Sequence, residues 1–351
     1  MFRPLKLALP VGVGIAAGGA VAGAAFAIAE YVVRQMTAPS RRRTPLNLGF
    51  TPFETGVHFE EVTLSGGHDS PIRGWLLLQP APPGRGEKSA PTILACGGYR
   101  SQRSDVLGIS SALWRAGYNV LMFDYTGYGD EPGPVTLGYW EMADARAALR
   151  YLRSRFPDAP LGVLGFSMGA AVAIMVAARE PDVRAVFADS PFTDQREIVR
   201  YQVGRKFRLS ASQQGEWLAR VVLPLVDRRL ARLFGFRLSD VDPLRDVASL
   251  APRPLALLHG EADTTIPVEH TRRMEAAARA AGVPVEAQYI PGAGHCQAYF
   301  FDRAGYCARA TRFFASHVGV PVATPASPPS PPSAIRNQAP RTTERPLAAL
   351  S

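Results

Sequence analysis

The segment LGVLGFSMGAAVAIMVA, residues 161–177, decides the expected fold. Residues 161–166 form a short, nearly unbroken apolar run, which is typical of a strand buried in a parallel sheet. Small apolar residues from Met168 onward favour a helix. Between them lies Ser167, flanked by Gly165 and Gly169. A turn this sharp forces the serine into a strained backbone conformation and exposes its hydroxyl above the sheet.

Composition sets the outer limits on fold and partners. The 351 residues are 47% hydrophobic, so the chain can bury one large core, and disordered and collagen-like classes are excluded for most of its length. The three cysteines form an odd set without metal-ligand spacing, so we expect neither a disulfide framework nor a metal site. No nucleic-acid motif accompanies the net charge of +9, so we expect no nucleic-acid partner.

The middle of the chain alternates between strand-like and helix-like periods. The strand-like runs are 58–64, 72–79, 92–96, 118–124, 161–166, 183–189, 254–259 and 284–290. The helical segments are 104–116, 136–155, 168–180, 267–281 and 303–317. Two strands without a helix, followed by repeated strand and helix, predict a mostly parallel eight-stranded sheet that starts antiparallel and has helices on both faces. In such sheets, sites lie at the carboxyl ends of strands.

A serine hydroxyl needs a base, and the base needs an orienting carboxylate. Of six histidines, we choose His295, which follows the last predicted strand on a glycine-rich loop. The expected acid is Asp263, on the loop after the preceding strand, with Asp189 as the alternative. The order Ser167, Asp263, His295 is the order expected of one fold in particular.

An oxyanion hole completes the expected site. The residue after the nucleophile supplies one backbone N–H, from Met168, and the loop ACGGYRSQRS after the third strand supplies the other. We assign that second donor to Tyr99, with Gly98 as the alternative. The resulting chemistry, acyl transfer to water, requires no cofactor and no metal.

The chain resembles the α/β-hydrolase superfamily over roughly residues 55–318. Within it, seven collinear segments are similar to the bacterial group of serine aminopeptidase-like or acylaminoacyl-peptidase-like hydrolases. They are GGYRSQRSD, FDYTGYGDEPG, LGYWEMADARAALRYL, GFSMGAAVA, DSPFTD, HGEADTTIP and GAGHCQAY. Gly97-Gly98 stands where the family has His-Gly, and Thr126 and Glu131 replace an arginine and a serine. These departures change the rim of the expected site but leave the triad intact.

The resemblance implies a cap inserted between the sixth and seventh core strands, at about residues 193–250. Eleven basic residues there alternate with apolar residues at roughly helical spacing. This pattern favours a helical lid whose apolar side covers the site and whose charges face water. The alternative is a basic amphipathic face that lies on anionic lipid.

The two ends of the chain differ in composition from the middle. Residues 7–29 are uncharged and flanked by basic residues, so we expect a retained membrane anchor in residues 1–34, in the bacterial inner membrane, followed by a linker at 35–54. The rival interpretation is a cleaved signal peptide. The flanking charges leave the side of the membrane open. Residues 55–319 form the expected hydrolase domain, and the Pro/Ser/Ala-rich tail at 320–351 is predicted to be disordered.

These features together predict a serine hydrolase that cleaves a carboxylic ester or thioester of a small-molecule or lipid acyl substrate. Esters need less leaving-group assistance than amides, and no feature of the sequence indicates recognition of a peptide end. Two alternatives remain: a serine aminopeptidase or acyl-peptide hydrolase, and a membrane-tethered binding protein of the same fold without chemistry. The sequence leaves the oligomeric state open.

Overall fold

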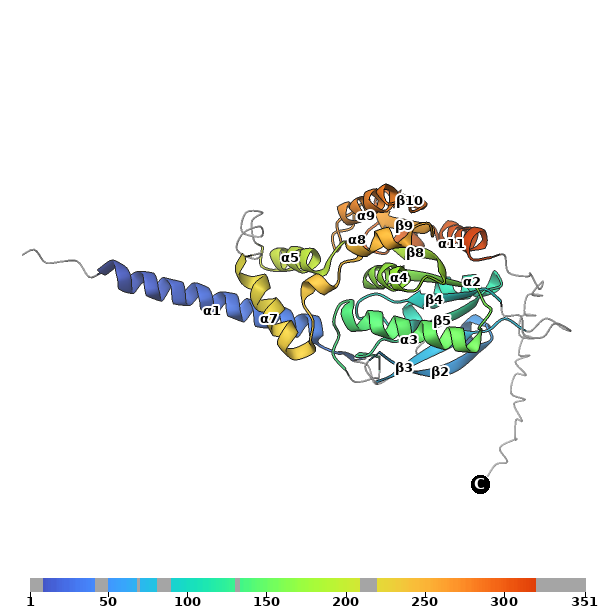
Figure 1. The fold of residues 1–351 in the computed structure, drawn as a ribbon, viewed down its shortest axis with the longest axis horizontal. Coiled ribbons are helices and arrows are strands. Elements are labelled where there is room, and N and C mark those ends of the chain that lie inside the picture. The colour runs from blue at the N-terminus through green and yellow to red at the C-terminus, as the bar shows by residue number, and fades with distance from the viewer. Residues whose placement is uncertain are drawn as a thin grey trace, which may run out of the picture.

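The computed structural model describes residues 9–41, 50–67, 70–80, 90–129, 133–208 and 220–319, without the side chains of 9–21 and 40–41 (Figure 1). The predicted tail at 320–351 lies outside the described residues, as do Glu131 and part of the expected cap. One central sheet with helices on both sides forms the body of the molecule, and one long helix extends from it (Figure 1).

An eight-stranded sheet carries the fold, in the order β10-β9-β8-β7-β4-β5-β3-β2. Strand β3 pairs antiparallel with β2 and β5, and the remaining neighbours pair in parallel. The strands are β2 (Phe59–Ser65), β3 (Pro71–Leu77), β4 (Thr92–Cys96), β5 (Asn119–Phe123), β7 (Leu161–Phe166), β8 (Val183–Asp189), β9 (Leu255–Gly260) and β10 (Val285–Ile290). The predicted strands match these within two residues at each end.

Helices cover both faces because successive residues of each central strand point to opposite sides. Leu94 and Val163 pack in one core cluster with α3, α4 and α9, whereas Ile93 and Leu164 pack in another with α2 and α11. The helices are α2 (Leu107–Arg115), α3 (Tyr139–Arg155), α4 (Met168–Arg179), α9 (Glu269–Ala280) and α11 (Arg303–His317). The expectation of an α/β-hydrolase fold with a mostly parallel sheet is confirmed.

Short elements complete the connections. Helix α10 (Ala298–Phe301) precedes α11, and the 3-10 turns η1 (Pro52–Thr55) and η2 (Arg103–Val106) precede β2 and α2. Strand β1 (Ser40–Arg41) pairs in parallel with β6 (Tyr128–Gly129), outside the main sheet. This small pair ties the segment after the first helix to the body of the protein.

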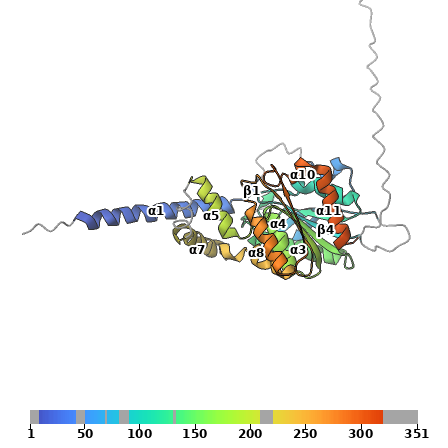
Figure 2. The same cartoon turned by 90° about the horizontal axis from the view of Figure 1, so that it is seen from above.

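The insertion between β8 and β9 is helical where the structure describes it. It contains α5 (Gln195–Lys206), α7 (Leu223–Phe234), η4 (Leu238–Asp240), α8 (Pro243–Asp246) and η5 (Val247–Leu250). Leu223, Val226 and Leu230 form the buried stripe of α7 and pack in one cluster with the long N-terminal helix. The apolar side of α7 therefore contacts protein, and α7 lies beside that helix in both views (Figure 1 and Figure 2).

Helix α1 (Leu9–Thr37) occupies the segment that we interpreted as a membrane anchor. Within the described part of the chain, no helix is long and apolar enough to cross a membrane. The anchor expectation is therefore not supported. The C-terminal half of α1 contacts the rest of the protein: Ala29, Val32 and Val33 are buried against α5 and α7, and Glu30 pairs with Arg229 at 3.1 Å.

Arg253 fixes the end of α4 relative to the sheet. Its guanidinium Nη1 donates to the carbonyl oxygens of Ala177, Glu180 and Val183 at 2.7, 3.0 and 3.2 Å. The last carbonyls of a helix lack partners within the helix, so a cation placed there both bonds them and offsets the negative end of the helix dipole. Arg253 thus holds the helix that starts beside Ser167.

Replacing Arg253 with methionine should lower the free energy of unfolding by about 3 kcal/mol, because bonds from a charged donor contribute about 1.5–3 kcal/mol and the freed carbonyls stay partly buried. Urea denaturation followed by circular dichroism measures this difference. Arg150→Met, at an exposed position on α3, is the control and should change stability by less than about 0.5 kcal/mol. Equal stability of the two variants would contradict the role of Arg253.

Candidate active site

Ser167 occupies the junction between β7 and α4 in a strained conformation. Its φ and ψ are 54° and −119°, in a region that non-glycine residues seldom adopt. The Ser167 amide donates to the carbonyl oxygen of Asp189 at 2.8 Å, which braces the turn against the end of β8. The helix begins at Met168, so the backbone N–H groups of its first turn face the space beside the serine.

The two glycines of the motif allow the strand and helix to approach each other closely. A Cβ atom at Gly165 would lie 2.1 Å from the carbonyl oxygen of Gly169, and one at Gly169 would lie 2.3 Å from the carbonyl oxygens of Cys96 and Gly97. Real Cβ atoms do not approach backbone so closely. The motif therefore packs the start of α4 against both β7 and the loop after β4.

The structure brings Ser167, His295 and Asp263 into one chain of hydrogen bonds. His295 Nε2 lies 2.8 Å from Ser167 Oγ, and His295 Nδ1 lies 2.6 Å from Asp263 Oδ2. An ionised carboxylate only accepts hydrogen bonds, so Nδ1 carries the proton and Nε2 accepts from the serine hydroxyl. The imidazole is thereby in the tautomer that can remove a proton from the serine.

Two adjacent loops, after β9 and β10, hold Asp263 and His295 next to each other. Asp263 follows β9 and His295 follows β10, and these strands pair in parallel, so their carboxyl ends meet at one edge. The Ala262 amide donates to the carbonyl oxygen of Ala293 at 2.9 Å. A Cβ atom at Gly260 would lie 2.3 Å from that same oxygen, so the close contact between the loops needs a glycine there.

Asp263 accepts hydrogen bonds at both carboxylate oxygens. The amides of Thr265 and Ile266 donate to Oδ1 at 2.7 and 2.9 Å. His259 Nε2 lies 3.2 Å from Oδ2 and 2.8 Å from the carbonyl oxygen of Ile266, while its Nδ1 lies 2.6 Å from Thr271 Oγ1. The buried His259 ring is thus fixed with its Nε2–H directed at two acceptors, one of which is Asp263.

These contacts keep Asp263 ionised. Burial by itself raises the pKa of this carboxyl group, but hydrogen bonds from His259 and His295, the positive charge that His295 can carry, and the Ile266 amide together hold the pKa well below its usual range. A carboxylate that stays charged at neutral pH can orient the imidazole and stabilise the imidazolium that forms during proton transfer.

Asp189, the alternative acid in the sequence, faces other partners. Ser190 Oγ and Tyr306 OH donate to its carboxylate at 2.8 and 3.0 Å, and burial raises its pKa. It lies at the end of β8 behind the nucleophile turn, whereas Asp263 bonds His295. Of the two candidate acids, Asp263 is therefore the one that is hydrogen-bonded to His295, which in turn contacts Ser167.

The expected oxyanion residues Tyr99 and Met168 both lie beside Ser167, in the wall of the same cavity. A Cβ atom at Gly98 would lie 3.5 Å from Ser167 Cβ, so the loop after β4 passes directly next to the nucleophile. Gly98 and Tyr99 are adjacent in this loop, and the structure brings both near the serine. The choice between their amides as the second donor stays a prediction.

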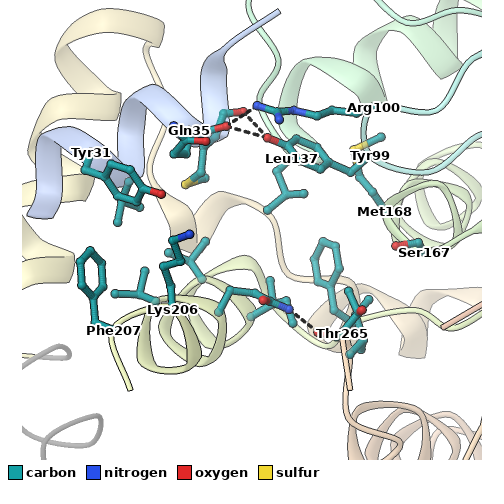
Figure 3. A pocket seen from close by; sticks show the side chains of 18 residues that line it. Tyr31, Gln35, Tyr99, Arg100, Leu137, Ser167, Met168, Lys206, Phe207 and Thr265 are labelled. Atoms are coloured by element: carbon teal, nitrogen blue, oxygen red, sulfur yellow. Dashed lines mark hydrogen bonds between the residues drawn. The ribbon is translucent and has the colours of Figure 1, made fainter. Parts of the chain in front are cut away.

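A largely apolar cavity of about 440 Å³ opens on one side of Ser167, between α1 and α5 (Figure 3). Figure 3 shows Ser167 and Met168 at one end, Tyr31 and Phe207 at the other, and Tyr99 in the wall near α1. The rings of Tyr31 and Phe207 meet edge to face at a centroid distance of 5.8 Å. The volume is within the range of about 300–1,000 Å³ usual for small-molecule sites.

A second cavity of about 580 Å³ lies on the other side of the nucleophile. His295 lines it, and its side chain is 24% exposed. Polar groups are more prominent in this wall, where Asp105, Ser101 and Arg303 accompany Tyr299. Ser167 thus lines both cavities.

Sequence reasoning missed two contributors to this site. His259 was considered only as a competing base, although its spacing of four residues before Asp263 placed it in the same strand-to-loop connection. The α1 residues that line the first cavity were missed because the segment was interpreted as a membrane anchor. Glu30, Arg34 and Gln35 follow the uncharged span at 7–29 and gave no signal against that interpretation, because flanking charges are also typical of an anchor.

Comparison with known proteins agrees with the fold. Residues 92–310 match the model of the alpha/beta hydrolase family. The uncharacterised protein Rv2307c of Mycobacterium tuberculosis is 34% identical over 212 residues, which are 59% of this chain and 63% of that protein. The match therefore spans less than two thirds of this relative. YfhR of Escherichia coli, also uncharacterised, is 28% identical over 252 residues, or 70% and 76% of the two chains.

Solved structures give the same result. The esterase Pf2001 of Pyrococcus furiosus superimposes with a TM-score of 0.62 at 25% identity, covering 81% of this chain and 98% of that chain. An acylaminoacyl peptidase of Pyrococcus horikoshii has a TM-score of 0.56 at 13% identity, covering 75% and 42% of the two chains. At that identity, the second likeness shows a shared fold alone.

The substitution Gly165→Ala should lower the free energy of unfolding by more than about 3 kcal/mol, because its Cβ atom meets rigid backbone. Gly162→Ala, on the same strand, is the matched control. Its Cβ atom meets only the ends of the Ile93, Phe314 and Val318 side chains, each at 2.9 Å, so the loss should be smaller. Thermal unfolding measures both, and an equal or larger loss in Gly162→Ala would contradict the packing argument.

Stability should depend on pH through Asp263. Because the pKa in the folded protein lies below the unfolded value of about 3.9, the stabilisation is fully present above that value and is lost as pH falls further. The stability advantage of the native chain over Asp263→Asn should therefore shrink below about pH 4. Denaturation at several pH values measures it. The control is Asp158→Asn, at an exposed position, for which the stability difference from the native chain should not change with pH in this way. If the stability difference between the native chain and Asp263→Asn were independent of pH, the low pKa assigned to Asp263 would be refuted.

Proposed function

Since the chain belongs to the alpha/beta hydrolase family, we propose that it is a serine hydrolase that cleaves a carboxylic ester or thioester. The observation that carries this proposal is the hydrogen-bonded chain from Ser167 through His295 to Asp263. The strained turn exposes the Ser167 hydroxyl. The unprotonated Nε2 of His295 can accept the hydroxyl proton, and the Asp263 carboxylate is ionised. These are the three conditions that an activated serine nucleophile needs.

The proposed reaction proceeds in two stages. Ser167 Oγ attacks the substrate carbonyl while His295 Nε2 takes its proton, and the resulting imidazolium then protonates the leaving group. Water next attacks the acyl-enzyme, with His295 again acting first as base and then as acid. Asp263 stabilises the imidazolium in both stages. The amides of Met168 and Tyr99 donate to the oxygen that becomes negative, and such a donor contributes about 10²–10³ in rate.

Ester substrates are favoured over amides because an ester needs less assistance to its leaving group. The esterase Pf2001, which is similar over 98% of its own length, supports the same choice. The alternative peptidase activity has a structural neighbour as well, but that likeness extends to the fold alone. Amide hydrolysis is accordingly an outcome of the test described next.

Labelling by a fluorophosphonate probe tests the proposal. The probe should modify the native chain at Ser167 but not Ser167→Ala, and the same variant should lose about 10⁶-fold in turnover of p-nitrophenyl esters, as in a well-studied serine protease. Ser249→Ala, at an exposed position remote from the site, is the control and should label normally.

Three results would overturn this proposal. A native chain that neither labels nor turns over esters would be a binding protein of this fold. Ester turnover that persists in Ser167→Ala would reject the nucleophile. Cleavage of aminoacyl p-nitroanilides without cleavage of the matching esters would identify a peptidase.

A further inference from the structure

The position of His295 indicates how a substrate lies across Ser167. The leaving group takes its proton from His295 Nε2, so it must lie on the side of that nitrogen. His295 lines the second cavity, and the described residues that line the first cavity do not include it. The leaving group therefore belongs in the second cavity, and the acyl group extends into the first.

The first cavity suits an aliphatic chain. Its walls are largely apolar, with Val32 and Met36 on α1 opposite Val199 and Val203 on α5. Each of these four side chains is less than 9% exposed. Burial of a methylene group is favourable by about 0.8 kcal/mol, so each carbon added to an acyl chain in a channel with such walls should strengthen binding.

Helix α1 forms one of these walls, although the match to the family model begins only at residue 92. Its end is fastened to the loop that carries the expected oxyanion donor. Tyr99 OH and Arg100 Nη2 both donate to the carbonyl oxygen of Gln35 at 2.8 Å. A carbonyl in the last turn of a helix has no partner within the helix, so these donors satisfy it and hold α1 next to the nucleophile.

We infer that α1 is part of the substrate site, where it forms one wall of a channel for an aliphatic acyl chain and the leaving group lies in the second cavity. This inference rests on the proposed function for its orientation. It assigns the enzyme to esters or thioesters of linear aliphatic acids. The chain runs from Ser167 toward the Tyr31–Phe207 pair at the far end of the channel (Figure 3).

The full-length Val32→Trp variant tests the wall, because an indole at this position fills the channel. The fall in kcat/KM with p-nitrophenyl octanoate should exceed the fall with p-nitrophenyl acetate at least tenfold. Retained acetate turnover shows that the fold and triad are intact. Ala27→Trp, at an exposed position of the same helix outside the cavity lining, is the matched control and should leave both values unchanged.

Val32→Thr is the second variant, because it nearly keeps the shape of valine while a polar hydroxyl group replaces one methyl group. It should raise KM for the octanoate ester about fivefold or more relative to KM for the acetate ester. An unchanged ratio of octanoate to acetate kcat/KM in both Val32 variants would overturn the inference. So would an equal decrease for both esters in Val32→Thr.

Binding of decanoate to Ser167→Ala, measured by calorimetry, separates this inference from the proposed function. Adding Val32→Trp to that variant should weaken decanoate binding at least tenfold. If the native chain hydrolyses no ester but the double variant loses decanoate binding, the proposed function fails and the channel stands. If the native chain hydrolyses esters but decanoate binds equally well to both variants, the channel fails and the hydrolase stands.

Discussion

The close approach of β7 and α4 is the constraint on which the site depends. Neither Gly165 nor Gly169 has room for a Cβ atom, because a Cβ atom at either position would lie only 2.1–2.3 Å from a backbone carbonyl oxygen. This packing permits the strained φ of 54° at Ser167 and directs its hydroxyl toward the loops at the carboxyl ends of the strands. It also sets the loop after β4 against the start of α4, which brings Tyr99 to the nucleophile.

The charge on Asp263 is the second feature on which the site depends. A carboxylate as deeply buried as that of Asp263 would ordinarily favour its neutral form. Two backbone amides and two imidazole N–H groups surround it instead, so the charged form is the stable one. That fixed charge determines which nitrogen of His295 carries the proton. The arrangement therefore links the rigid end of β9, through Asp263 and His295, to the reactivity of a serine on β7.

The sequence predicted the parts of the structure that local pattern controls. The strands of the main sheet, the turn at Ser167 and the loops of Asp263 and His295 follow from apolar periodicity, glycine spacing and chain order, and the predicted family membership is confirmed. Proximity in space could not be predicted in the same way. Chain order favoured Asp263 over Asp189, but whether either carboxylate meets His295 depends on side-chain direction at two adjacent strand ends, which the sequence does not specify.

The position of α1 against the cap could not be predicted for a similar physical reason. A helix buried between two other helices and a helix in lipid both need an apolar surface, so composition alone does not distinguish them. The pairing of Glu30 with Arg229 and the contacts of Val32 and Val33 with the cap become visible only in three dimensions. These contacts place the C-terminal part of α1 beside the cavity at Ser167.

The central claim is that Ser167 forms a covalent acyl-enzyme. Rapid quenching of the full-length protein with excess p-nitrophenyl octanoate, followed by peptide mass spectrometry, tests it most directly. The account predicts that the peptide containing Ser167 gains the mass of one octanoyl group and that the adduct disappears as water completes the turnover. An octanoyl group on another residue, or turnover with no adduct detectable at any quench time, would contradict it.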